Sequence, residues 1–310
     1  MTTRYINMQG KNVHRAAAAA PARTAPKPAG KTAPRRRRKT KKRRHPIRTL
    51  LLLALLAAAV WGGLRLLDGA RVEADWASRG IAVQDGTASA IARLAHRDSR
   101  AQAILDNPEA YPADYLDMLA RNSETLDFVL GYPEHHGNAP AQSLSESLDT
   151  VPLLLQWDAR WGYQPYGSST VAVSGCAPVC LSMAASYLTG DASITPYRVA
   201  QYAANAGYYV PGQGTSWSLL TEGAAAFGVN CRQLALDEAQ INAALDAGHP
   251  VICSMSPGDF TTEGHFIVLY GRTADGYLVR DPNSISRSEK TWTYDRLSGQ
   301  IAALWECTAM

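Results

Sequence analysis

Acidic residues are absent from the first 48 positions of this 310-residue chain, which hold sixteen of its 31 lysines and arginines. The rest of the chain carries 15 basic and 27 acidic side chains, a net charge of −12, although the overall charge is +4. The chain is therefore a basic arm joined to an acidic globular part. Its overall charge alone does not indicate a nucleic-acid-binding protein.

Cysteines are few, and no CxxC pair or His/Cys spacing typical of a zinc site occurs. The sequence therefore implies no metal and no organic cofactor. An odd number of cysteines in an exported protein suggests one free, reactive thiol. The sequence leaves open which of the others pair; the five are Cys176, Cys180, Cys231, Cys253 and Cys307.

The basic arm is followed by sixteen residues without a charge, Thr49–Leu64, that are dominated by Leu and Ala. Residues 1–46 are rich in Ala, Pro, Lys and Arg, with little to bury, and we expect them to be disordered. Counting from Ile47 to Leu67, with Arg48 and Arg65 reaching toward the head groups, gives 21 residues, enough to cross about 30 Å of hydrocarbon. The sequence predicts a transmembrane helix over residues 47–67.

Positive charge predicts the orientation of this helix. The basic run Arg35–Arg44 should stay in the cytoplasm beside anionic lipid, which leaves the acidic part outside a single-pass membrane anchor. A cleaved signal peptide, with a small-residue site at Ala57–Ala59, is the alternative, and it also exports the acidic part. We favour lipid over nucleic acid as the partner of the arm, and no nucleic-acid role is expected.

The next two segments differ in pattern. Residues 68–150 show short amphipathic stretches separated by Pro and Gly, which predicts a helical stalk and linker that packs on the following domain or spaces it from the membrane. In residues 151–310 helical patterns come first and strand patterns later, which favours an α+β domain with an antiparallel sheet. A first short strand is expected at Val151–Leu155, before the helices.

Cys176 opens a helical pattern. Pro178 suits the first helical turn, and Gly190 suits the end of the helix. Cys176 is therefore expected at the helix N-cap, where free N–H groups and the helix dipole favour an anion such as a thiolate. The alternative is a structural cysteine or half of a disulfide. Cys180, one turn later on the apolar face, is expected to pack in the core.

His265 and Asp281 are brought together by a predicted hairpin. Asp275-Gly276 is a turn signal between two apolar runs, so His265 should face positions 281–284 of the next strand. A cysteine nucleophile needs a histidine base, and that base needs an acceptor that orients it. Asp281 and Asn283 both lie in the window and both stay open, while His249 is a less favoured base.

Gln156 follows the predicted first strand. Its side-chain amide and the backbone N–H of Cys176 are candidates for an oxyanion hole. Loss of one such donor typically costs about 2.7–4 kcal/mol of transition-state stabilisation. The other interpretation is an ordinary polar residue at a strand end.

Four motifs together resemble those of bacterial cysteine peptidases of family C39, in the papain-like superfamily: Leu155-Gln156-Trp157-Asp158, Gly175-Cys176-Ala177-Pro178, Gly264-His265-Phe266-Ile267-Val268-Leu269 and Asp281-Pro282-Asn283-Ser284. The resemblance covers residues 151–310. It implies a papain-like fold, with Cys176 as nucleophile, His265 as base, Asp281 as orienting residue and Gln156 at the oxyanion hole. Relatives usually carry Gly where this chain has Ala177, which could restrict the backbone beside the nucleophile.

The favoured function is a membrane-anchored cysteine peptidase that hydrolyses peptide bonds outside the cell membrane through a thioester. Bacteriocin processors of this family carry the domain on a transporter, which this sequence does not contain, so cleavage after a double-glycine leader is not implied. Two alternatives stay open. One is an amidohydrolase or transpeptidase of peptidoglycan stem peptides, and the other is a non-catalytic surface binding module on the same fold.

Overall fold

The computed structural model describes residues 46–310, apart from the side chains of residues 46 and 64–66. The chain divides into two compact units after Leu53. The expected disorder of the basic arm and the lipid contact of Arg35–Arg44 concern residues that lie outside this description. The predicted boundaries between arm, membrane helix, stalk and peptidase-like domain stay predictions.

Helix α1 (Pro46–Ser78) is longer than the predicted membrane segment. By length and composition, its part from Ile47 to Ser78 is apolar enough to cross a membrane, a test that a signal sequence also passes. The helix continues past Leu67 because its last turns join a core: Trp76 is buried, and Val72 packs beside it. The predicted membrane segment is thus the first part of a longer helix.

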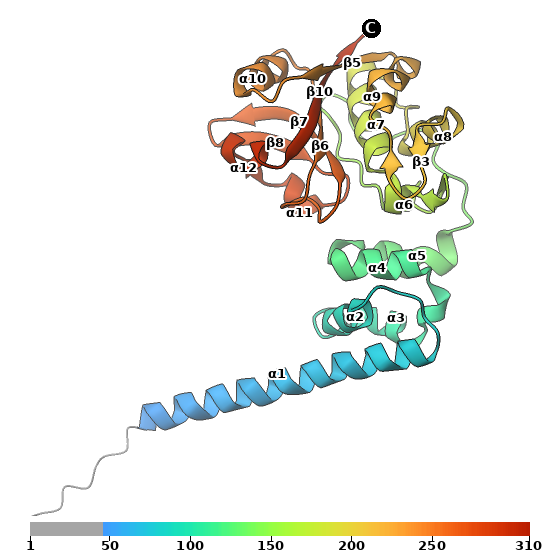
Figure 1. Cartoon of the computed structure of the whole chain (residues 1–310). Coiled ribbons are helices and arrows are strands. Elements are labelled where there is room, and N and C mark those ends of the chain that lie inside the picture. The colour runs from blue at the N-terminus through green and yellow to red at the C-terminus, as the bar shows by residue number, and fades with distance from the viewer. Residues whose placement is uncertain (1–45) are drawn as a thin grey trace, which may run out of the picture. The chain divides into compact units, whose positions relative to one another are not determined.

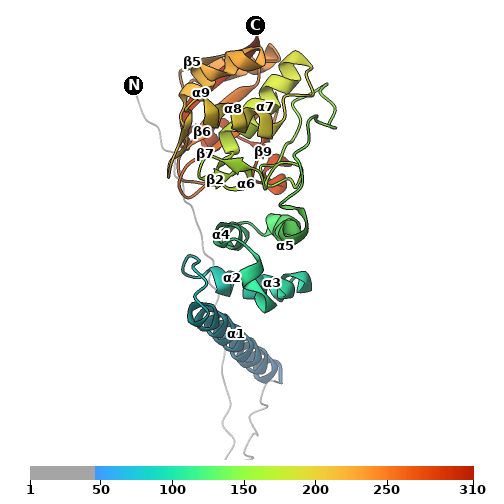
Figure 2. The ribbon, with the colours of Figure 1, turned by 90° about the vertical axis from the view of Figure 1, so that its right-hand side faces the viewer.

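A helical region follows α1 (Figure 1). Its core joins Trp76 and Leu116 to Trp157 and Tyr163, which lie beyond the predicted linker. The region therefore packs on the C-terminal domain, and in both views α4 and α5 lie between that domain and α2 and α3 (Figure 1, Figure 2). The elements are α2 (Thr87–Ala95), η1 (Ser99–Ala101), α3 (Gln102–Asp106), η2 (Pro108–Ala110), α4 (Ala113–Arg121), η3 (Ser123–Thr125) and α5 (Leu126–His135).

The C-terminal domain confirms the predicted α+β class. Its main sheet is antiparallel, in the order β5-β10-β6-β7-β8-β9. The strands are β5 (Val229–Leu234), β6 (Val251–Met255), β7 (His265–Thr273), β8 (Gly276–Arg280), β9 (Thr291–Trp292) and β10 (Ile301–Ala309), with two-residue strands at β1 (Pro165–Tyr166), β2 (Ser169–Thr170), β3 (Tyr209–Val210) and β4 (Gly214–Thr215).

Helices cover both faces of this sheet (Figure 1). On one face Val179 and Met183 of α7 share a core with Phe266 and Val268 of β7. On the other face Ile241 of α10 packs with the alternate residues of β6 and β7, those that point away from α7. The helices are α6 (Val171–Ser174), α7 (Cys176–Thr189), α8 (Pro196–Asn205), α9 (Ser218–Thr221), η4 (Gly223–Phe227), α10 (Glu238–Asp246), α11 (Ile285–Ser288) and α12 (Tyr294–Ser298).

The first predicted strand is wrong. Val151–Leu155 has no regular secondary structure, although most of it is buried. Isolated contacts hold the segment instead of a ladder: Arg280 donates to the Val151 carbonyl oxygen, and the backbone N–H of Gln156 donates to Pro282. The apolar pattern of the segment therefore reflects burial and not strand pairing. The strand β8, whose Arg280 contacts the segment, is already paired on both sides, with β7 and β9.

A disulfide joins the edge strand β5 of the main sheet to its neighbour β10. Cys231 of β5 and Cys307 of β10 stand directly opposite each other and are bonded, although they are 76 positions apart in the chain. Cys176, Cys180 and Cys253 are free. The pairing that the sequence left open is thus Cys231–Cys307, and it ties β10, the last strand of the chain, to the edge strand β5.

Candidate active site

Cys176 is the first residue of α7, and Gly175 is its N-cap. The predicted N-cap position is therefore off by one residue, although the thiol still lies at the end where helical N–H groups lack helical acceptors. Gly175 cannot carry a side chain, because a Cβ there would lie 2.4 Å from the carbonyl oxygen of Val171. Cys176 is partly exposed, whereas Cys180 is buried, and burial raises the pKa of the Cys180 thiol.

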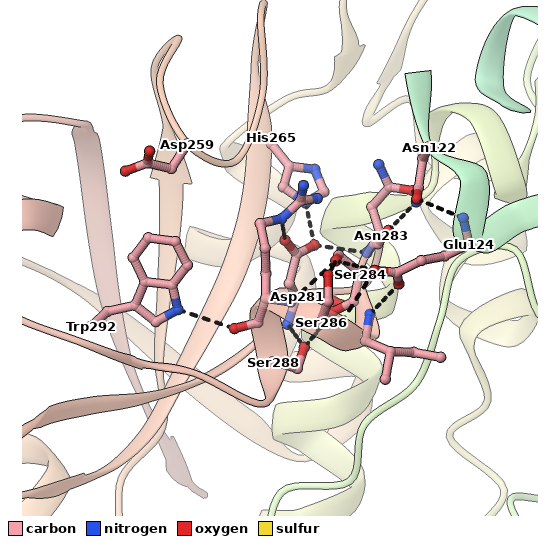
Figure 3. A network of polar contacts seen from close by, with 12 residues as sticks. Asn122, Glu124, Asp259, His265, Asp281, Asn283, Ser284, Ser286, Ser288 and Trp292 are labelled. Atoms are coloured by element: carbon pink, nitrogen blue, oxygen red, sulfur yellow. Dashed lines mark hydrogen bonds and ion pairs between the residues drawn. The ribbon is translucent and has the colours of Figure 1, made fainter. Parts of the chain in front are cut away.

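His265 begins β7, and the β7–β8 hairpin places it against Asp281 (Figure 3). Nε2 of His265 lies 2.8 Å from Oδ1 of Asp281. The side chain of His265 is 6% exposed and that of Asp281 is fully buried, so water does not screen this contact. Since Nε2 is engaged by Asp281, Nδ1 is the ring nitrogen left to act on Cys176, which lines the same cavity and helps to raise the pKa of His265.

The charges in this group favour an imidazolium. Burial alone would lower the pKa of His265, but the Asp281 carboxylate and Cys176 outweigh it and raise the pKa from 6.5 to about 10. Burial would likewise raise the pKa of Asp281, but His265 and Arg287 hold it below its usual range. A buried carboxylate that stays ionised keeps a proton on the imidazole beside the thiol.

Asp281 is fixed from several sides. Its Oδ1 also accepts the backbone N–H of Asn283 at 2.8 Å, and its Oδ2 accepts Nε of Arg287 at 2.5 Å. Its own backbone N–H donates to Ser288 Oγ at 2.8 Å. Asp281, rather than Asn283, therefore faces His265, and Asn283 contributes its backbone.

Gln156 lines the same cavity as Cys176. Its Nε2 donates to the carbonyl oxygen of Ala172 at 2.6 Å, which uses one of the two amide hydrogens. Its Oε1 is buried without a hydrogen-bond partner. The side chain is thus held beside the nucleophile with one N–H available, and its oxyanion role stays a prediction.

The cavity at Cys176 and His265 has a volume of about 410 Å³. One wall is the loop from Gly258 to Gly264, which leads into His265. The opposite wall comes from outside the predicted peptidase-like domain: it is formed by Met118, Arg121 and Asn122 of the helical region. The sequence predicted no part of that wall.

Comparison with known proteins identifies the domain. A model described as the Peptidase_C39 like family matches residues 148–309, just over half of the chain. The chain belongs to this family. The resemblance inferred from the four motifs is thereby confirmed, and the C39-like domain is a cysteine-peptidase-type domain.

Two solved structures resemble the C39-like chain. One is the peptidase domain of Streptococcus ComA, a bifunctional ABC transporter, with 20% identity, a TM-score of 0.35, and coverage of 44% of this chain and 93% of that chain. The other is a putative C39-like peptidase from Bacillus anthracis, with 16% identity, a TM-score of 0.31, and coverage of 50% and 94%. No curated protein matches the chain significantly.

Two other titratable side chains of the C39-like domain, those of His249 and Asp259, are engaged elsewhere. His249 binds Glu306 through Nδ1 at 2.8 Å and is not among the residues that line the cavity. Asp259 lines the cavity, but its carboxylate is engaged by Arg296. Among the described residues, His265 is thus the histidine that lines the cavity together with Cys176.

The sequence did not point to four residues around Asp281: two contact Asp281 itself, and two contact the loop that follows it. A local sequence signal could have pointed to Arg287 and Ser288, because Ser284 is a typical helix N-cap residue and caps the short helix α11 that contains them. Asn122 and Glu124 carry none, since their contacts with this loop span about 160 positions of the chain.

Proposed function

We propose that this chain is a cysteine peptidase in which Cys176 is the nucleophile, His265 the general acid and base, and Asp281 the residue that orients His265. One observation carries the proposal: a buried imidazole that is hydrogen-bonded to a carboxylate lines the same cavity as a partly exposed thiol at a helix N-terminus. These are the groups that thiol-based acyl transfer needs.

The first half of the reaction forms a thioester. The Cys176 thiolate attacks the peptide carbonyl carbon, and the carbonyl oxygen takes up the negative charge. The backbone N–H of Cys176 and the free N–H of Gln156 are the candidate donors to that oxygen. As the C–N bond breaks, His265 gives its Nδ1 proton to the leaving amine, which departs neutral.

The second half returns the enzyme to its starting state. Neutral His265 takes a proton from water through Nδ1 while the water oxygen attacks the thioester carbonyl. The C–S bond then breaks, the acid product leaves, and the thiolate and imidazolium form again. Asp281 stays ionised throughout and keeps Nε2 protonated, so that Nδ1 is the nitrogen that exchanges protons.

We further propose that α1 anchors the chain and that the C39-like domain lies outside the cell membrane. The charge asymmetry supports this orientation, since positive charge is retained in the cytoplasm. The Cys231–Cys307 disulfide supports it independently, because disulfides persist in oxidising compartments and are rare in the cytosol.

Peptide-library profiling of the full chain in detergent micelles tests this function. Quenched fluorescent peptides of varied sequence are incubated with the wild-type chain and with Cys176→Ala, and the products are identified by mass spectrometry. Cleavage at defined bonds that is lost in Cys176→Ala supports the proposal. A folded wild-type chain that cleaves no peptide, or cleaves equally with Cys176→Ala, overturns it.

A further inference from the structure

The helical region reaches the loop that carries Asp281 through two side chains (Figure 3). Asn122 follows α4, and Glu124 lies in the 3₁₀ turn η3. Both contact residues 283–286, in the C39-like domain. Strand pairing in the sheet already brings the chain to this loop. The contacts from Asn122 and Glu124 are therefore additional restraints on it, and their role has to be explained.

Glu124 holds the start of α11. Its carboxylate accepts the backbone N–H of Ile285 at 2.6 Å and that of Ser286 at 3.2 Å. It also accepts the hydroxyls of Ser284 and Ser286. Burial would raise the pKa of Glu124, but these hydrogen bonds outweigh burial and lower it, so the carboxylate is ionised where it meets the helix start.

Asn122 binds the backbone of Asn283, the residue before Ser284. Its Nδ2 donates to the carbonyl oxygen of Asn283 at 2.6 Å, and the indole N–H of Trp157 donates to the same oxygen at 3.3 Å. The backbone N–H of Asn283 is one of the donors to Asp281. Asn122 thus fixes the peptide unit that follows a direct partner of the orienting carboxylate.

The other end of α11 returns to Asp281. Arg287 and Ser288 are the last two residues of this four-residue helix, and they contact the carboxylate and the backbone of Asp281. A shift of the helix start therefore moves two of the groups that set the position of Asp281. Hydrogen bonds connect Glu124 to Ser284 and Ser284 to Arg287. Arg287 in turn binds Asp281, which binds His265.

We propose that Asn122 and Glu124 are positioning residues of the peptidase, acting through the 281–288 loop to hold Asp281 against His265. This inference rests on the proposed function. It makes the segment from Ala113 to Thr125 part of the catalytic unit, since the same segment also forms one wall of the cavity.

The rate at which iodoacetamide alkylates Cys176 measures this positioning without a known substrate. The thiolate at neutral pH depends on the neighbouring imidazolium, which in turn depends on Asp281. In Glu124→Ala the loop loosens, and we expect alkylation at pH 6 to slow by about tenfold, since a small displacement of a positioned group has effects of 10- to 100-fold. The acid limb of the rate–pH profile should move to higher pH.

Three variants control the experiment. Glu124→Gln keeps the shape and loses the charge, so it should fold and show a smaller effect in the same direction. Glu109→Gln removes an exposed carboxylate of the same helical region, paired with Arg79, and should leave the rate unchanged. In an Asp281→Asn background, Glu124→Ala should change the rate by less than about twofold, because both substitutions act on one group.

The outcomes separate the inference from the proposed function. Slower alkylation in both Glu124 variants, with the effect lost in the Asp281→Asn background, supports the inference. Lower melting temperatures with unchanged rate–pH profiles make Glu124 a purely structural residue and overturn the inference alone. A wild-type chain in which Cys176 reacts no faster than a free thiol overturns the proposed function and the inference with it.

Discussion

Nε2 of His265 and Oδ1 of Asp281 lie 2.8 Å apart, and both side chains are closed to water. A buried carboxylate is costly unless it is paired, and here His265 and Arg287 pair it. The same contact thus sets the orientation of the His265 ring and stabilises its positive charge. It also leaves Nδ1 as the ring nitrogen that the proposed reaction would use.

Asp281→Asn tests this relationship in catalysis. The amide cannot stabilise an imidazolium as a carboxylate does, so the pKa of His265 should fall and the turnover rate should drop by about 10²- to 10⁴-fold. The alkaline limb of the kcat/KM profile should move to lower pH. The measurement is the pH–rate profile on a peptide found by library profiling, and an unchanged alkaline limb would contradict the assignment of Asp281.

The same pair predicts how stability depends on pH. The pKa of His265 is raised in the folded state, so its contribution to the free energy of unfolding is complete below about pH 6.5 and is lost as the pH rises toward about 10. Each pH unit in that window should cost up to about 1.4 kcal/mol. The pKa of Asp281 is lowered, so its contribution is lost on the acid side, below about pH 4.

Urea unfolding of the wild-type chain and of His265→Gln between pH 6 and pH 10 measures the first of these effects. Other groups titrate in this range, so the informative quantity is the difference between the two chains. We expect the stability advantage of the wild type to shrink as the pH rises. A difference that stays constant or grows with pH would show that His265 is not protonated in the folded state.

The disulfide predicts a redox-dependent stability. Cys231–Cys307 closes a loop whose ends are 76 positions apart. By lowering the entropy of the unfolded chain, a cross-link over such a loop stabilises the folded state by about 4 kcal/mol. Dithiothreitol should lower the melting temperature of the wild-type chain by roughly 10 °C. It should have no effect on a Cys231→Ala/Cys307→Ala double variant, whose melting temperature should match that of the reduced wild type. Equal melting of the oxidised and reduced wild type would refute this prediction.

The parts of the fold that could be predicted from the sequence have local causes. Thr195 caps α8, Asp237 caps α10, and Gly190 ends α7 in the left-handed region, all as their residue types indicate. The Asp275-Gly276 turn and strand pairing were enough to bring His265 and Asp281 to the same place. Each of these signals lies within a few residues of the feature it specifies.

What the sequence did not reveal depends on contacts between distant segments. The apolar run Val151–Leu155 reads as a strand because the pattern reports burial and not the absence of a partner strand. Glu124 reads as the start of an amphipathic helix, and its contacts with residues 284–286 have no local signature. The cavity wall formed by Met118, Arg121 and Asn122 was missed for the same reason.

Covalent labelling with a peptide-based electrophilic probe, located by mass spectrometry, tests the central claim most directly. The claim is that the thiol of Cys176 is reactive because the imidazole of His265 contacts it. The account predicts that the probe labels Cys176 in the folded wild-type chain and that labelling disappears in a folded His265→Ala variant. Labelling of Cys176 at the same rate in both chains, or of Cys253 in its place, would contradict it.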